Sequence, residues 1–296
     1  GDTHYTIPSG KKELKEAIIK YHKDRFNQEL QGNCIQITNS ASHAMYLILN
    51  VILNKGDEVI LFAPLFPNYI EQVKLNDGTP VIYESLYEEK WQIKEEKLES
   101  LVTSKTKALI INNPCNPSGV YYNEESYEAI YRVAKKHNLL IIADDIYTIF
   151  TYKTTFKSIA QYKDLKDQVI QIYSFSKDFC MTGWRLGYII ADNDLIRRTE
   201  FLNENLVYSA NTISQNAAIY ALENYKVIQE KLFNIYKERI NFTCDLIAKS
   251  KYFTSIPAEG TFYVFMNIEK TGMNAKEFSD YIYEKAHIKV FRGDLF

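Results

Sequence analysis

The chain has 296 residues, 46% of them hydrophobic and 24% charged, the balance of a soluble globular protein with room for about two domains. A formal net charge of −2 and the lack of a long basic run argue against a nucleic-acid-binding or membrane-surface protein. The four cysteines show no metal-ligand spacing, and the first residues contain no apolar signal core. We therefore expect a cytoplasmic protein without a bound metal.

The first half of the chain alternates between helical and strand patterns. Amphipathic or apolar periodicity predicts helices at Lys11–Phe26, at about Ser42–Leu53 and at Glu124–His137. Short apolar runs predict strands at Cys34–Thr38, Glu58–Phe62, Val81–Glu84, Ala108–Asn112, Leu139–Asp144, Val169–Tyr173 and Tyr188–Ala191. Several of these strands are apolar on both faces, which is typical of a parallel sheet covered by helices on each side. The pattern predicts a large, doubly wound, mostly parallel α/β domain.

The pattern changes after about Asn205. Helices are predicted at Thr212–Tyr225 and Val227–Lys249, the second being long enough to connect two domains. A strand at Thr261–Ile268, a helix at Asn274–Lys285 and a strand at Lys289–Phe291 then suggest a smaller α+β domain. We divide the chain into a large domain at 1–225 and an incomplete small domain at 226–296.

The most specific segment follows the strand that ends near Tyr173. It reads Ser174-Phe175-Ser176-Lys177 and continues as Met181-Thr182-Gly183-Trp184-Arg185-Leu186-Gly187-Tyr188. A lysine beyond a strand end is usually a solvated surface residue, but this one lies between small hydroxyl residues and a glycine-bounded Arg. The string resembles the cofactor-lysine motif of the class I/II, fold-type I aminotransferases. That resemblance implies that Lys177 binds pyridoxal 5′-phosphate (PLP) as a Schiff base.

Two other segments resemble the same family. Asp144 ends an apolar strand in Asp144-Asp145-Ile146-Tyr147, at the edge where doubly wound sheets bind ligands, although a turn or helix cap is an alternative reading. Asn116 lies in a turn-forming loop of Asn, Pro, Ser and Gly residues. The resemblance implies that Asp144 pairs with the pyridine nitrogen of PLP and that Tyr147 binds its phenolic oxygen. It implies that Asn116 binds the same oxygen and helps to orient the substrate carboxylate.

A strand-to-helix junction at Ser40-Ala41-Ser42 predicts an anion site, because free backbone N–H groups and the helix dipole meet there. An ordinary Ser N-cap would give the same sequence signal. The resemblance assigns this turn to the PLP phosphate, usually with Gly where Ser40 stands, and adds Ser174 and Arg185 as further phosphate ligands. An Arg fits this role because its planar fork can bind a phosphate through two hydrogen bonds.

Two aromatic residues match the family less specifically. Phe66 matches the aromatic ring that stacks on the pyridine of PLP, although plain packing is an alternative. Tyr5 matches a tyrosine that reaches the phosphate of the neighbouring subunit, which implies a homodimer. The resemblance extends from Tyr5 to Gly293. Family members have a further segment at each end, so we expect the sequence to be part of a longer protein, with a truncated relative as the alternative. The arginine that binds the substrate carboxylate belongs to the missing C-terminal segment, and Arg292 does not match it.

Taken with the resemblance, the sequence predicts a PLP-dependent aminotransferase that moves an amino group between an L-amino acid and a 2-oxo acid. A PLP-dependent carbon–sulfur β-lyase on the same fold is the nearest alternative, since fold alone does not fix the reaction. A non-catalytic PLP-binding or interaction module is the alternative from another class. The sequence does not predict which amino acid is the substrate.

Overall fold

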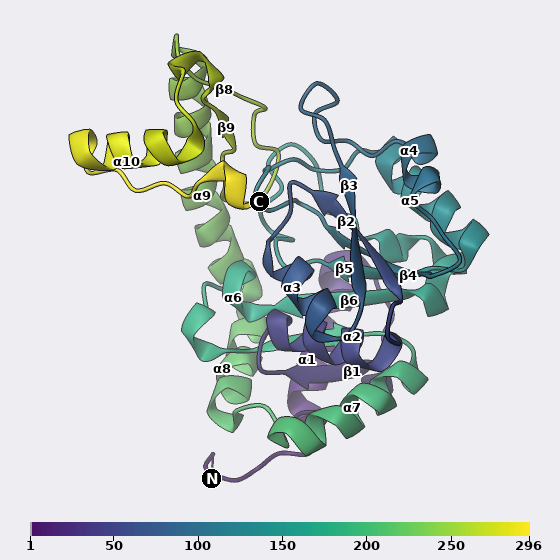
Figure 1. Cartoon of the computed structure of the whole chain (residues 1–296). Coiled ribbons are helices and arrows are strands. Elements are labelled where there is room, and N and C mark those ends of the chain that lie inside the picture. The colour runs from purple at the N-terminus through teal and green to yellow at the C-terminus, as the bar shows by residue number, and fades with distance from the viewer. Residues whose placement is uncertain (1) are drawn as a thin grey trace.

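A seven-stranded sheet forms the centre of the computed structural model, which describes residues 2–296 apart from the side chain of Lys166 (Figure 1). The strands lie in the order β1 (Ile35–Thr38), β7 (Gly187–Ile190), β6 (Val169–Ser174), β5 (Leu140–Asp144), β4 (Thr106–Asn112), β2 (Glu58–Ala63), β3 (Thr79–Glu84). Neighbouring strands are parallel except that β7 runs antiparallel to both β1 and β6. The predicted α/β class with a mostly parallel sheet is confirmed.

Helices cover both faces of this sheet. One face packs against α2 (Ala41–Ile52), α3 (Asn68–Leu75) and α7 (Asn193–Val207). The other packs against α4 (Glu95–Ser100), α5 (Glu124–His137), α1 (Lys12–Phe26) and α8 (Thr212–Glu223).

Strand β5 shows why the central strands are apolar throughout. Successive strand residues point to opposite faces, and here both faces are covered. Ile141 packs in the same cluster as Ile130 of α5, whereas Ile142 packs in the cluster that contains Leu47 of α2. All four of these side chains are fully buried, so β5 is fixed firmly and its last residue, Asp144, has a defined position.

The long helix α9 (Tyr225–Ala248) leads away from the sheet to a small C-terminal part (Figure 1). That part contains β8 (Thr254–Ser255), β9 (Met266–Asn267) and α10 (Ala275–Ala286). Short helical segments complete the described chain: α6 (Phe175–Asp178) and the 3-10 turns Gly32–Cys34, Ile159–Gln161, Lys163–Gln168, Thr182–Trp184, Glu269–Thr271 and Gly293–Leu295.

Of the two strands predicted near the C-terminus, Thr261–Ile268 is largely wrong and Lys289–Phe291 is entirely wrong. Within Thr261–Ile268, only the two residues of β9 form a strand. Thr261 has a φ of 59°, which breaks an extended run, and the ring of Phe262 packs on Phe150 instead of taking part in a sheet. The predicted strand Lys289–Phe291 belongs to no strand in the structure. Phe291, the apolar residue that ends this segment, is exposed and so has no sheet to pack against.

Candidate active site

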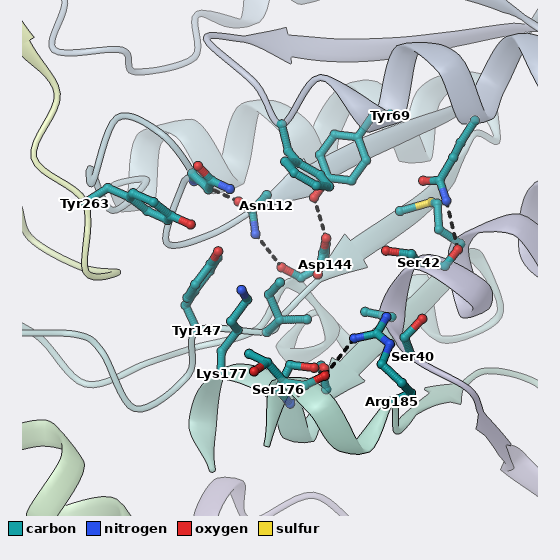
Figure 2. A pocket seen from close by; sticks show the side chains of 18 residues that line it. Ser40, Ser42, Tyr69, Asn112, Asp144, Tyr147, Ser176, Lys177, Arg185 and Tyr263 are labelled. Carbon is teal, nitrogen blue, oxygen red and sulfur yellow. Dashed lines mark hydrogen bonds between the residues drawn. The ribbon is translucent and has the colours of Figure 1, made fainter. Parts of the chain in front are cut away.

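A cavity of about 250 Å³ opens where β4, β5 and β6 end (Figure 2). Asn112, Asp144 and Ser174 are the last residues of these strands, and all three line it. Every predicted site residue except Tyr5 contributes to its wall, namely Ser40, Ala41, Ser42, Phe66, Asn116, Asp144, Tyr147, Ser174, Lys177 and Arg185. The structure therefore brings together side chains from five separate regions of the sequence at the edge of the sheet that binds ligands in doubly wound folds.

Lys177 is placed by the short helix α6, which begins directly after β6. The hydroxyl of Ser174 caps this helix by accepting a hydrogen bond from the N–H of Ser176 at 3.0 Å. The amine of Lys177 points into the cavity, and its Nζ lies 5.7 Å from the centre of the Phe262 ring (Figure 2). Partial burial lowers the pKa of Lys177; Asp144 opposes this shift, and Arg185 adds to it. A larger neutral fraction makes the amine a better nucleophile and base.

Asp144 is buried at the bottom of the same cavity. Tyr69 donates a short hydrogen bond to its Oδ2, and Nδ2 of Asn112 donates to its main-chain oxygen at 2.9 Å (Figure 2). Its Oδ1 is buried and has no hydrogen-bond partner among the described residues. Burial raises the pKa of Asp144 to about 6, while the Tyr69 hydrogen bond and the charge of Lys177 limit the rise. Above that pH the group is a carboxylate with one free acceptor oxygen.

Asn116 and Tyr147 lie beside Asp144. The N–H of Asn116 donates to Oδ1 of Asn112 at 2.8 Å, so one asparagine side chain links Asn116 to Asp144. Oδ1 of Asn116 is also buried without a partner in the part of the chain that the structure describes. Burial and the neighbouring Tyr263 raise the pKa of Tyr147 well above its usual value, so its phenol stays protonated at neutral pH. The wall thus offers both donors and acceptors to a polar ligand.

A positively polarised corner lies where β1 passes into α2. Ser40 caps α2, and its φ of 144° lies in the region that favours glycine. The first N–H groups of α2 have no partner within the helix and face the cavity wall at Ala41 and Ser42. A Cβ on Gly187 would lie 2.8 Å from the nitrogen of Ala41, so only glycine lets β7 approach this turn so closely. The guanidinium of Arg185 lies beside Ser40 (Figure 2), so a positive charge and the N-terminal end of a helix dipole meet in one corner of the cavity.

Two residues discussed from the sequence lie elsewhere. Tyr5 is 82% exposed, and its ring packs on Tyr208 with a centroid distance of 4.8 Å. It does not line the cavity of its own chain, and its expected role at a neighbouring subunit stays a prediction. Arg292 forms an ion pair with Asp294 at 2.6 Å and does not line the cavity either.

The sequence prediction missed several residues of the cavity wall, above all Tyr69, Asn112 and Tyr263. The sequence could have predicted Asn112 as a site residue, because it ends an apolar strand just as Asp144 does. Tyr69 lies in the first turn of α3, and its contact with Asp144 depends on how α3 packs on the sheet. Tyr263 lies in the part of the predicted strand Thr261–Ile268 that is not a strand in the structure.

Comparison with known proteins agrees with this geometry. The model of the aminotransferase class I and II family matches residues 1–296. An aspartate aminotransferase of Thermotoga maritima is 34% identical over 296 residues, which cover 100% of this chain and 77% of that protein. An asparagine–oxo-acid transaminase of Streptococcus mutans is 35% identical over 280 residues, covering 93% of this chain and 70% of that protein. The solved structure of an aromatic aminotransferase from Pyrococcus horikoshii superimposes with a TM-score of 0.95 at 31% identity, covering 100% of this chain and 80% of that one.

The fold and the cavity define a transferase of the α/β type, and the chain belongs to the aminotransferase class I and II family. Its reaction is the transfer of an amino group, as in the relatives that match over its whole length. Among residues 2–296, no helix is both long and apolar enough to cross a membrane. The described side chains include no group of three or more His, Cys, Asp or Glu placed to hold a metal ion.

Proposed function

We propose that this aminotransferase uses PLP, held by Lys177, to move an amino group between an L-amino acid and a 2-oxo acid. The observation that carries the proposal is the meeting of three groups in one cavity: the Lys177 amine, the free Oδ1 of Asp144 and the anion site at Ser40 and Arg185. A phosphorylated aldehyde with a basic ring nitrogen has a complementary group for each of these three.

The residues present fit PLP at each of its polar positions. Oδ1 of Asp144 is a buried acceptor without a partner, as a protonated ring nitrogen requires. Asn116 and the phenol of Tyr147 can bind the phenolic oxygen. The phosphate fits the start of α2 together with Ser174 and Arg185. The ring of Phe66 lines the same cavity and can pack on the pyridine.

When bound, PLP supplies an electron sink for the negative charge that develops at the substrate Cα. The protein's own groups then have separate tasks. The ionised carboxylate of Asp144 favours protonation of the ring nitrogen. The neutral amine of Lys177 takes the proton from the substrate Cα, and partial burial favours this neutral form. Asn116 orients the substrate carboxylate.

The same proposal includes a homodimer and two domains. Tyr5 is exposed and does not line its own cavity, so we propose that it reaches the anion site of the neighbouring subunit. Exposed apolar side chains on α7 and α8, for example Phe201 and Ile213, support a contact between subunits. We place the domain boundary at residues 225 and 226, where α9 begins to lead away from the sheet.

Relatives named aspartate aminotransferase make L-aspartate the first substrate to test. The direct test is transfer of a nitrogen-15 label from L-aspartate to 2-oxoglutarate, with L-asparagine and L-phenylalanine as parallel donors. Label in glutamate supports the proposal. Pyruvate release from cystathionine without any oxo acid would identify a β-lyase instead. Binding of PLP without turnover of any donor would identify a non-catalytic module.

A further inference from the structure

Tyr69 and Asp144 are in direct contact below the cavity. Tyr69 is 5% exposed and lies in the first turn of α3, and its hydroxyl donates to Oδ2 of Asp144 (Figure 2). The other carboxylate oxygen, Oδ1, is buried without a partner among the described residues. The two oxygens of one carboxylate therefore have different surroundings: Oδ2 is bound to Tyr69, whereas Oδ1 has no partner, in a residue that lines the cavity.

Contacts on both sides fix this arrangement. The main-chain oxygen of Asp144 accepts from Asn112, so the backbone that carries the carboxylate is held. The ring of Tyr69 meets the ring of Phe66 edge-to-face with a centroid distance of 5.6 Å, which limits movement of the phenol. With Oδ2 engaged, rotation of the carboxylate would break a buried hydrogen bond, and this is costly.

We propose that Tyr69 is a positioning residue that acts through Asp144: it holds Oδ2, so that Oδ1 is presented to the ring nitrogen of PLP. This inference rests on the proposed function, because the ring nitrogen belongs to PLP. The side chain of Tyr69 also lines the cavity, but its hydroxyl is engaged by Asp144, so the effect of that hydroxyl on the cofactor passes through one oxygen atom of Asp144.

The charge of Asp144 depends on the same contact. Burial alone disfavours the carboxylate, and the hydrogen bond from Tyr69 is the largest contribution that lowers its pKa. Burial together with the Asp144 charge raises the pKa of Tyr69 well above its usual value, so the phenol remains a donor at neutral pH. Loss of the hydroxyl should leave a carboxylate that is both less ionised and free to rotate.

The test compares PLP with its analogue in which a CH group replaces the ring nitrogen. Their dissociation constants are measured by absorption titration for the wild type and for Tyr69→Phe. We expect Tyr69→Phe to weaken PLP binding about tenfold, the loss typical of a hydrogen bond to a charged group. Binding of the analogue should not change, because it offers no ring nitrogen to Asp144.

A matched control is Tyr83→Phe. Tyr83 is also fully buried, and its hydroxyl accepts from the N–H of Lys94 at 2.8 Å outside the cavity. It should change neither dissociation constant. Equal weakening of PLP and the analogue by Tyr69→Phe, or no weakening of either, would overturn the inference.

A wild type that binds neither PLP nor the analogue would contradict the proposed function itself, and this result is distinct from a failure of the inference about Tyr69. Should Tyr69→Phe not fold, p-aminophenylalanine at position 69 keeps the ring size and a weaker donor. The inference then predicts a preference for PLP over the analogue that is smaller than in the wild type, and an unchanged preference would contradict it.

Discussion

The amine of Lys177 and the carboxylate of Asp144 face one cavity from the ends of two adjacent parallel strands, and each favours the charged form of the other. Burial acts in the opposite direction on both groups: it raises the pKa of Asp144 to about 6 and lowers the pKa of Lys177. Such pairs of shifted groups are typical of active sites.

Replacing the lysine tests the covalent link. Lys177→Ala should abolish transamination and leave any bound PLP removable by dialysis, because no other amine lines the cavity in the described chain. Borohydride reduction followed by mass spectrometry should show a PLP adduct on the wild type and none on the variant. Lys12→Ala, a change at an exposed lysine, should keep the adduct. Transamination retained by Lys177→Ala would refute the assignment.

Arg185 should affect binding of the cofactor chiefly through the phosphate. Arg185→Met removes a charged donor from the anion site and should weaken PLP binding roughly tenfold to hundredfold. Binding of pyridoxal, which lacks the phosphate, should change little. Both affinities can be measured by absorption titration. Arg198→Met removes an exposed arginine of α7 that pairs with Asp194, and it serves as the control. A similar loss for pyridoxal and PLP would argue against phosphate binding by Arg185.

Asn112 should matter for stability as well as for the cofactor. Asn112→Leu removes both hydrogen bonds that link Asp144 to Asn116 and leaves two buried backbone groups unpaired. We expect a loss of roughly 2–4 kcal/mol in the free energy of unfolding, measured by urea titration. Asn205→Leu, at an exposed position of α7, should cost far less. Equal stabilities of these two variants would contradict the bridging role of Asn112.

Asp178 gives a pH dependence of stability. Burial raises its pKa to about 7 from an ordinary 3.8, while hydrogen bonds from Thr148 and Ile149 limit the rise. Between those pH values the folded state keeps a proton that the unfolded state has lost. Its contribution to the free energy of unfolding therefore falls as pH rises, by up to about 1.4 kcal/mol per pH unit.

Asp178→Asn removes this titration. Urea titrations at several pH values should show a shallower fall in stability for the variant between pH 3.8 and about 7. Parallel pH profiles of the wild type and the variant would show that Asp178 does not carry the proton.

The sequence predicts the sheet well because its strands are buried on both faces. The bounds of α5 agree with the prediction, and those of the sheet strands differ from it only near their ends. The small C-terminal part was predicted less well. There the apolar residues Phe262 and Tyr263 pack on Tyr147 instead of forming a strand, and a local pattern cannot distinguish these two outcomes.

The site was predictable to the extent that its residues lie at strand ends or in a recognisable motif. Asp144 and Lys177 meet both conditions. Tyr69 meets neither, since its role depends on the packing of α3 on the sheet, which brings its hydroxyl to Asp144, a residue far away in the chain. The sequence predicts Asn112 as the end of a strand, but its hydrogen bonds to Asp144 and Asn116 are visible only in the structure.

The central claim is that PLP bound to Lys177 exchanges amino groups in this cavity, and an absorption spectrum tests it most directly. The purified protein is mixed with PLP, then with L-aspartate and other amino acids in turn, and finally with 2-oxoglutarate. The account predicts a band of lysine-bound PLP that converts to the band of pyridoxamine phosphate with at least one amino acid and returns with the oxo acid. A lysine-bound band that no amino acid changes would contradict transamination by this chain.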